Sequence, residues 1–279
     1  MNTDELMLLL GIAEEDRDDC VALLADTTDD AAVMQVLDAL ARSFGTFDEV
    51  TVQEPTSREL VWLKAFLLLT PTVVEWHRAR GIPEAVTRDT LADVGRHVAI
   101  SRRVTGEFGL QTWRWLTHHF TSRLFAIGRL QFALERAATG QGGVFEAGDW
   151  VLALHIPESG PLRPEVVDDS ITAASRFFAE HFPDKPVTVA TCHSWMLDPH
   201  LIERMPADTN VGAFIRRFAP FGTSKDAPAE ALYFVFRTRD LDRVPDLPRD
   251  TSLQRAVLER IDRGETWQLA WGYLALPSA

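Results

Sequence analysis

Cysteine is scarce in this chain of 279 residues, which has only Cys20 and Cys192. Because there is neither a CxxC pair nor a series of half-cystines, the sequence excludes a disulfide framework and argues against a structural zinc site. No apolar stretch reaches the roughly 20 residues that a membrane-spanning helix needs. The apolar run near the N-terminus follows acidic residues, whereas a signal peptide needs a basic flank. These absences predict a reducing compartment, and the cytoplasm is the expected location.

Basic residues are also in deficit, with 28 Lys and Arg against 41 Asp and Glu and a formal net charge of −13. A surface this acidic repels phosphate backbones and anionic lipids, so we expect neither nucleic acid nor a membrane as a partner. The sequence has no P-loop and no dinucleotide-binding fingerprint. The adjacent His118 and His119 lack the i, i+4 spacing that puts two metal ligands on one face of a helix. We therefore expect no bound metal.

The first 120 residues have the pattern of helices. Segments 16–27 and 29–45 carry apolar residues at helical spacing, and 83–104 places Leu91, Val94 and Val98 on one face. Segment 57–81 predicts two helical pieces separated at Thr70-Pro71, because proline interrupts a helix. No stretch here alternates with the period of two that strands require. The sequence thus predicts a helical N-terminal domain over residues 1–120.

From residue 121 onward, strands and helices mix. Segments 123–134, 148–157, 187–195, 230–238 and 266–276 are short, apolar and predicted to be strands. Segments 163–182 and 251–265 predict helices, and shorter helices are expected within 199–205 and 211–219. The order strand–helix–strand over 148–195 predicts a right-handed crossover between parallel strands. The expected fold class is therefore α+β or α/β, with a mixed-sheet domain and flanking helices over residues 121–279.

The loop 155–165, "HIPESGPLRPE", has the chemistry of an anion site. Pro164 suits the first position of the following helix, whereas Arg163 cannot cap the helix as Ser, Thr or Asp does. Uncapped N–H groups beside Arg163 and the turn Ser159-Gly160 can bind an anion. The alternative is that water covers these N–H groups and Arg163 lies on the surface. Glu158 favours that alternative, because its carboxylate repels an anion.

Five stretches carry a resemblance to a known family: "GEFGLQTWRWLTHH", "LFAIGRLQF", "LALHIPESGPLRPE", "CHSWMLDPHL" and "GETWQLAWGYL". With them, the chain resembles bacterial acyltransferase-like proteins that join a helical N-terminal domain to a C-terminal domain of the GNAT (N-acetyltransferase) type. The resemblance implies acyl-CoA as the donor substrate, with its pantetheine arm between two splayed parallel strands. It also implies that the pyrophosphate binds at the loop 157–165, where Ser159, Gly160 and Arg163 lie. The sequence departs from the family's glycine-rich loop, because Gly160 is the only glycine there and Pro161 has no N–H.

"VTVATCHSW" (187–195) becomes the second of the two splayed strands in this interpretation. His193 is the first candidate for the general base that removes a proton from the acceptor, His155 the second and Glu158 the third. Cys192 could instead be a nucleophile, with His155 across the gap as its base, because neighbouring residues on a strand point to opposite faces. The structural alternative is a buried cysteine and a core histidine on the same face as Val189.

Three functions remain open from the sequence. The leading hypothesis is an acyl-CoA-dependent acyltransferase that acts by direct transfer on an amine or a small hydroxyl compound. The second is a non-catalytic module that binds an acyl thioester or another anion as a sensor, which the unusual phosphate loop favours. The third is an enzyme that uses Cys192 covalently. The oligomeric state is open.

Overall fold

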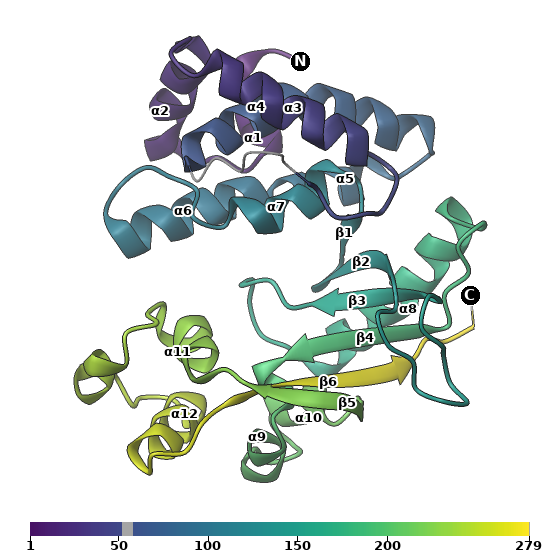
Figure 1. Cartoon of the computed structure of the whole chain (residues 1–279), viewed down its shortest axis with the longest axis vertical. Coiled ribbons are helices and arrows are strands. Elements are labelled where there is room, and N and C mark those ends of the chain that lie inside the picture. The colour runs from purple at the N-terminus through teal and green to yellow at the C-terminus, as the bar shows by residue number, and fades with distance from the viewer. Residues whose placement is uncertain (52–57, 279) are drawn as a thin grey trace. The chain divides into compact units, whose positions relative to one another are not determined.

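A computed structural model describes residues 1–51 and 58–278 (Figure 1). The chain forms two compact units. The helical unit comprises residues 1–127 and 131–135, and the sheet unit comprises residues 128–130 and 136 onward. The predicted boundary between residues 120 and 121 remains a prediction. Among the described residues, no helix is both long and apolar enough to cross a membrane.

In the described residues up to 120, the helical unit confirms the expected helices. Its helices are α1 (Thr3–Leu9), α2 (Glu14–Ala25), α3 (Asp30–Ser43), α4 (Glu59–Ala79), α5 (Glu84–Leu91), α6 (Asp93–Thr105) and α7 (Trp113–Phe120). The predicted break at Thr70-Pro71 is wrong, because α4 continues through Pro71. Ser57, the first residue of that predicted segment, lies outside the described residues.

Burial explains why α4 tolerates a proline. A proline inside a helix costs about 3 kcal/mol, since it removes one backbone hydrogen bond. Trp62, Phe66 and Val73 of this helix are all fully buried in the core of the helical unit. Each such side chain contributes about 1.5–3 kcal/mol when it leaves water. The summed burial of one long apolar helix therefore outweighs the cost of Pro71.

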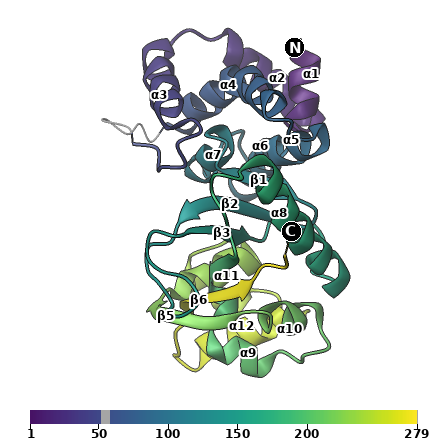
Figure 2. The same cartoon turned by 90° about the vertical axis from the view of Figure 1, so that its right-hand side faces the viewer.

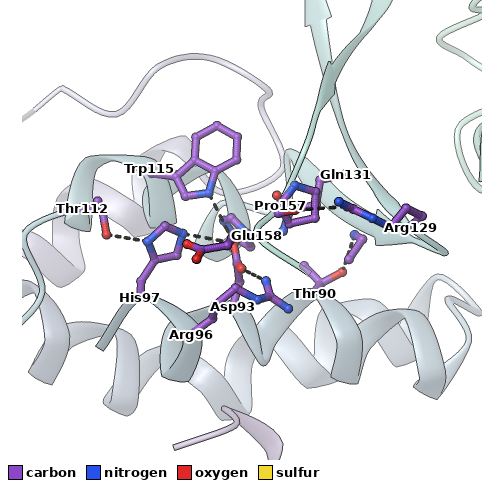
Figure 3. Close-up of polar contacts among 12 residues, drawn as sticks. Thr90, Asp93, Arg96, His97, Thr112, Trp115, Arg129, Gln131, Pro157 and Glu158 are labelled. Carbon is purple, nitrogen blue, oxygen red and sulfur yellow. Dashed lines mark hydrogen bonds and ion pairs between the residues drawn. The ribbon is translucent and has the colours of Figure 1, made fainter. Parts of the chain in front are cut away.

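A buried carboxylate organises the polar interior of this unit (Figure 3). Asp93, at the start of α6, is 1% exposed. It accepts hydrogen bonds from Trp115 Nε1 at 3.3 Å, from Gln131 Nε2 at 3.0 Å and from the guanidinium of Arg96. His119 Nε2 lies 2.9 Å from Asp93 Oδ2, and burial lowers the pKa of His119 to about 3, so this ring is neutral.

We expect Asp93→Ala to destabilise the protein by about 3 kcal/mol or more, because it leaves several buried donors without an acceptor. Asp89→Ala is the matched control, since Asp89 lies one helix earlier with an exposed side chain. Its cost should stay within about 0.5 kcal/mol. Urea unfolding followed by circular dichroism measures both, and equal stability of the two variants would contradict this role of Asp93.

Six strands form one sheet in the order β1-β2-β3-β4-β6-β5. They are β1 (Leu124–Ile127), β2 (Leu130–Arg136), β3 (Trp150–His155), β4 (Val189–Ser194), β5 (Ala219–Asp226) and β6 (Gln268–Ala275). The remaining helices are α8 (Pro164–His181), α9 (Pro199–Arg204), α10 (Asn210–Ile215), α11 (Pro228–Phe236) and α12 (Ser252–Asp262), with 3-10 turns η1 (Trp195–Leu197) and η2 (Leu241–Asp246). Both views place α10 beside β5 and β6 (Figures 1 and 2).

The predicted pair of parallel strands joined through a helix is confirmed. Strands β3 and β4 pair in parallel, and α8 connects them. Strand β6 runs antiparallel to both β4 and β5, so the sheet is mixed, as the fold class requires. Pro164 occupies the first turn of α8, and Asp198 caps α9 through a hydrogen bond from His200 N–H at 2.8 Å.

One predicted strand is wrong, the predicted strand 123–134 divides into β1 and β2, and one strand was missed. Segment 230–238 was expected to be a strand, but it lies mostly in α11, where Leu232 packs with Val244 and Leu258. Its apolar residues are too continuous for their period to distinguish a strand from a buried helix. The sequence of β5 gave no strand signal, because Phe221 is the one buried residue of this strand. An exposed strand of this kind has no apolar alternation.

Candidate functional site

The ends of β3 and β4 bring the two candidate histidines to corresponding positions. The two strands pair at Leu152–Ala190 and Ala153–Thr191. Beyond these pairs, β3 continues for two residues to His155, and β4 continues through His193 to Ser194. Side chains on a strand alternate, so His155 projects from the same face as Ala153, and His193 from the same face as Thr191. The two histidines therefore share one face at the carboxyl ends of adjacent parallel strands.

His193 stands on an aromatic surface and remains open to solvent. Its ring stacks on Trp271 of β6 with centroids 4.1 Å apart and an interplanar angle of 8°. The residue is exposed. Partial desolvation lowers the pKa of His193, and the positive charge of Lys225 lowers it further. An imidazole with this pKa is neutral at pH 7 and can accept a proton.

Further aromatic side chains extend this surface along the same face. Phe221 of β5 lies 5.6 Å from Trp271 and 5.9 Å from Tyr273 between ring centroids. Phe145, from the segment between β2 and β3, contacts both Phe221 and Tyr273 edge to face. Together these rings give His193 an apolar surround, which suits an apolar substrate group.

Cys192 lies on the opposite face of the sheet. It pairs across the strands with Gly272, where a Cβ atom would come within 2.7 Å of Phe218 and 2.8 Å of Leu197. Burial raises the pKa of Cys192 to about 12, so the thiol stays protonated. Alternation also puts Cys192 and His155 on opposite faces, and the structure therefore does not bring together the expected pair. Both facts weigh against a nucleophilic role for Cys192.

An arginine from the β1–β2 turn shapes the loop between β3 and α8 (Figure 3). Arg129 donates from Nη1 to Pro157 O at 3.1 Å, from Nη2 to Gly160 O at 2.8 Å and from Nε to Pro161 O at 3.2 Å. Its backbone N–H donates to Ser170 Oγ of α8 at 2.7 Å. One guanidinium thus gathers three loop carbonyls. The oxygens of these three peptide groups therefore all point to the side of the loop where Arg129 lies.

Gly128, beside Arg129, permits this close approach. Its φ is +64°, and a Cβ atom there would lie 2.6 Å from Ser170 Oγ. Any other residue would therefore be strained in the turn and would displace Ser170. The turn consequently joins the loop and the first half of α8 into one local arrangement.

The helix start expected to bind an anion has no side-chain cap. The N-cap residue of α8 is Arg163, which makes no capping hydrogen bond. Arg163, Ser159 and Gly160 are all exposed, and Gly160 has a φ of +72°. The nearest partner of Arg163 is Glu165, with Nε to Oε1 at 3.5 Å. A weak, exposed ion pair of this kind can exchange for a ligand.

Glu158, whose charge counted against an anion site, is paired. Arg237, which follows α11 with a φ of +59°, forms an ion pair with Glu158. Arg217 donates to Pro164 O at 3.2 Å and forms an ion pair with Asp168 at 2.9 Å. Arginines and carboxylates thus alternate around the start of α8, and the positive end of its dipole adds to the attraction for an anion.

The cavity of about 440 Å³ in the sheet unit lies elsewhere. None of the six predicted site residues lines it. It is formed by Asp168, Ile171, Thr172, Arg217, Ala219, Tyr273, Leu274, Ala275 and Pro277. These residues come from α8, from the start of β5 and from the carboxyl end of β6, whereas His155 and His193 lie at the carboxyl ends of β3 and β4.

Sequence reasoning missed three contributors to the site. Arg237 was hidden in a segment predicted to be a strand, and Lys225 lies in the missed strand β5. Arg129 carries no local signal, because its role depends on contacts with a loop about 30 residues away in sequence. In the part of the chain that the structure describes, no group of three or more His, Cys, Asp or Glu residues could hold a metal ion.

Sequence comparison gives the family. The profile of the N-acyltransferase N-terminal domain matches residues 1–122, and that of the GNAT-like C-terminal domain matches residues 124–274. The chain belongs to the family of N-acyltransferase-like proteins that these two domains define, which confirms the resemblance seen in the sequence. No curated protein matches the chain.

Solved structures agree with this classification. An acyltransferase in complex with CoA and 10C-teicoplanin is 32% identical, with a TM-score of 0.85 over 99% of this chain and 88% of that one. An acyltransferase with decanoyl-CoA and teicoplanin is also 32% identical, with a TM-score of 0.82 and the same two coverages. An acyltransferase with decanoyl-CoA is 31% identical, with a TM-score of 0.85 and again the same coverages. Each of these relatives is thus similar over almost the whole chain.

Proposed function

We propose that this protein is an acyl-CoA-dependent acyltransferase that moves an acyl group from the thioester to an amine or small hydroxyl acceptor by direct transfer. The observation that carries the proposal is the pair of parallel strands whose pairing ends before His155 and His193, next to an uncapped helix start. Family membership and the solved relatives with CoA and acyl-CoA support it. The teicoplanin in two of those relatives supports a small-molecule acceptor.

The donor site is assigned to the start of α8. The pyrophosphate of CoA would accept hydrogen bonds from the first N–H groups of the helix, with Arg163, Ser159 and Gly160 beside it. Arg129 holds the loop in shape, and Arg237 neutralises Glu158. Pro161 offers no N–H, but its carbonyl is used by Arg129. The Gly160–Pro161 peptide has no N–H, so the donors to the pyrophosphate are assigned to the helix start rather than to this loop.

His193 is assigned as the general base. The acceptor nitrogen or oxygen attacks the thioester carbonyl carbon, and His193 takes the proton that the acceptor loses. The carbon–sulfur bond then breaks, and the CoA thiolate leaves and takes up a proton. His155 stays the second candidate for the base, since it projects from the same face. Cys192 is the last of the candidate catalytic residues, because its thiol is buried and protonated and is therefore a poor nucleophile.

A non-catalytic sensor is the second candidate function. The observation that favours it is the loop itself, where Gly160 is followed by Pro161. Such a module would bind CoA without transferring an acyl group.

Three further proposals come from the sequence. We propose that the domain boundary lies near residue 120, that the protein is cytoplasmic and that it does not bind nucleic acid.

Titration calorimetry with CoA and octanoyl-CoA tests the donor site. We expect both ligands to bind, and Arg163→Glu to weaken binding by about tenfold or more, because it places a carboxylate beside the phosphates. Arg176→Glu is the matched control, since Arg176 is an exposed residue near the other end of α8. Equal affinity of the two variants for CoA would disprove the assignment of Arg163 to the donor site. If neither CoA nor octanoyl-CoA gave binding heat, the proposal that acyl-CoA is the donor would be wrong.

Release of free thiol from octanoyl-CoA, measured with a panel of amines, tests the catalytic assignments. His193→Ala should lower kcat by about 10²–10⁴-fold, as expected for loss of a general base. Cys192→Ala should retain activity within a few-fold, because a protonated thiol takes no part in direct transfer. Full activity in both His193→Ala and His155→Ala would disprove the base assignment. Binding without turnover across the panel would favour the sensor.

The pH dependence of kcat/KM tests the environment of His193. Because the pKa of His193 is lowered from its ordinary value of 6.5, the acid limb should lie below that pH. Lys225→Gln removes a repulsive charge, raises the pKa and should move the limb to higher pH. Lys185→Gln, the control in the same unit, should leave the limb in place. A limb that Lys225→Gln does not move would argue against His193 as the titrating base.

A further inference from the structure

The helical unit contains a cavity that the proposed acyl transfer does not use. Its volume is about 410 Å³. One side comes from the segment after α3, and the other from α4, α7 and the residues that follow α7. The lining residues are Asp48, Glu49, Val50, Thr51, Trp62, Trp113, Arg114, Thr117, His118, Thr121 and Arg123.

Arg123 gives this cavity a buried polar donor. The residue is 7% exposed, and its Nη2 donates to Glu135 at 2.6 Å. Its Nε is buried and has no hydrogen-bond partner. A buried donor without an acceptor costs about 1–3 kcal/mol, so a ligand oxygen that engages this guanidinium would gain free energy that water at the surface does not offer.

Aromatic rings form a wall of the same cavity. Trp62 and Trp113 stack with centroids 4.0 Å apart and an interplanar angle of 14°. Trp62 covers one face of Trp113, so the other face is the one that can meet a ligand. The exposed Arg114 lies 4.8 Å from the centroid of Trp113 on a flexible side chain. A rigid indole pair of this kind suits a ring with an apolar face.

The charges around the cavity select against an ion. Glu135 compensates the buried Arg123, while Asp48 and Glu49 stand at the exposed rim with Arg114. The rim carboxylates repel an anion, and the two arginines repel a cation. Hydroxyl groups suit both the carboxylates and the arginines, because a hydroxyl can donate a hydrogen bond to a carboxylate and accept one from a guanidinium.

We propose that this cavity binds a neutral sugar ring, with Trp113 against its apolar face, Asp48 and Glu49 as acceptors and Arg123 as a donor. A metal ion is not the expected occupant of this cavity, although His118 lines it. Among residues 1–51 and 58–278, no group of three or more His, Cys, Asp or Glu residues could hold a metal ion. The proposal does not depend on acyl transfer, and it is tested in the absence of CoA.

Saturation-transfer NMR of the full-length protein with the methyl glycosides of glucose, galactose and N-acetylglucosamine tests this site. We expect saturable binding of at least one glycoside. Asp48→Asn and Arg123→Lys should weaken it by about fivefold or more, since each removes one hydrogen bond to a hydroxyl. Arg123→Lys keeps the charge opposite Glu135. Asp38→Asn, on the exposed side of α3, is the control and should bind as the unaltered protein does.

Two further probes separate the alternatives. Inorganic phosphate and tetramethylammonium present an anion and a cation of small size to the same cavity. Binding of either ion with no glycoside binding would overturn the proposal, and so would glycoside binding that neither cavity variant changes. Thermal unfolding of each variant establishes that it is folded. If Arg123→Lys unfolds, Asp48→Asn alone decides, because Asp48 is exposed.

Discussion

The end of pairing between β3 and β4 is the constraint on which the candidate site depends. Parallel strands that paired over their full length would fill the space at their carboxyl ends with backbone hydrogen bonds. Here the ladder includes Leu152–Ala190 and Ala153–Thr191, and each strand then continues. His155 and His193 lie just beyond the paired residues, on the same face, at the side of the sheet where α8 begins. A ligand bound at this edge of the sheet would therefore lie close to both the start of α8 and the two imidazoles.

The proposed phosphate site also depends on the shape of the loop between β3 and α8, rather than on its glycine content. A glycine-rich loop lets peptide N–H groups approach phosphates, because it carries no side chains. In this chain a single guanidinium, that of Arg129, holds three carbonyls on one side of the loop. Arg237 pairs with Glu158, so the carboxylate that would repel a phosphate is already compensated. Two long-range arginine contacts thus fix three carbonyls of this loop and compensate its carboxylate, and no local sequence motif encodes either contact.

The sequence predicted what depends on local signals. Pro164 marked the start of α8, and the strand–helix–strand order gave the parallel pair. It failed where apolar periodicity was absent or ambiguous, as in β5 and α11. It also missed the contacts of Arg129 and Arg237, because each joins segments distant in sequence. Strand register decided the rest: it pairs His193 with Trp271, which puts the imidazole on the aromatic face, and it pairs Cys192 with Gly272.

The two interpretations of His193, as a core residue and as a base, are compatible in this structure. One face of the ring rests on Trp271, as in a core histidine, and this contact fixes its orientation, while partial burial and then the charge of Lys225 lower its pKa. The residue as a whole stays exposed, so its ring nitrogens can exchange protons with a bound molecule. A fully buried histidine such as His119, with a pKa of about 3, would be neutral but unreachable. A fully solvated one would be half protonated near pH 6.5 and poorly oriented. Packing on one face alone gives both orientation and access, and a general base at the end of a strand needs both.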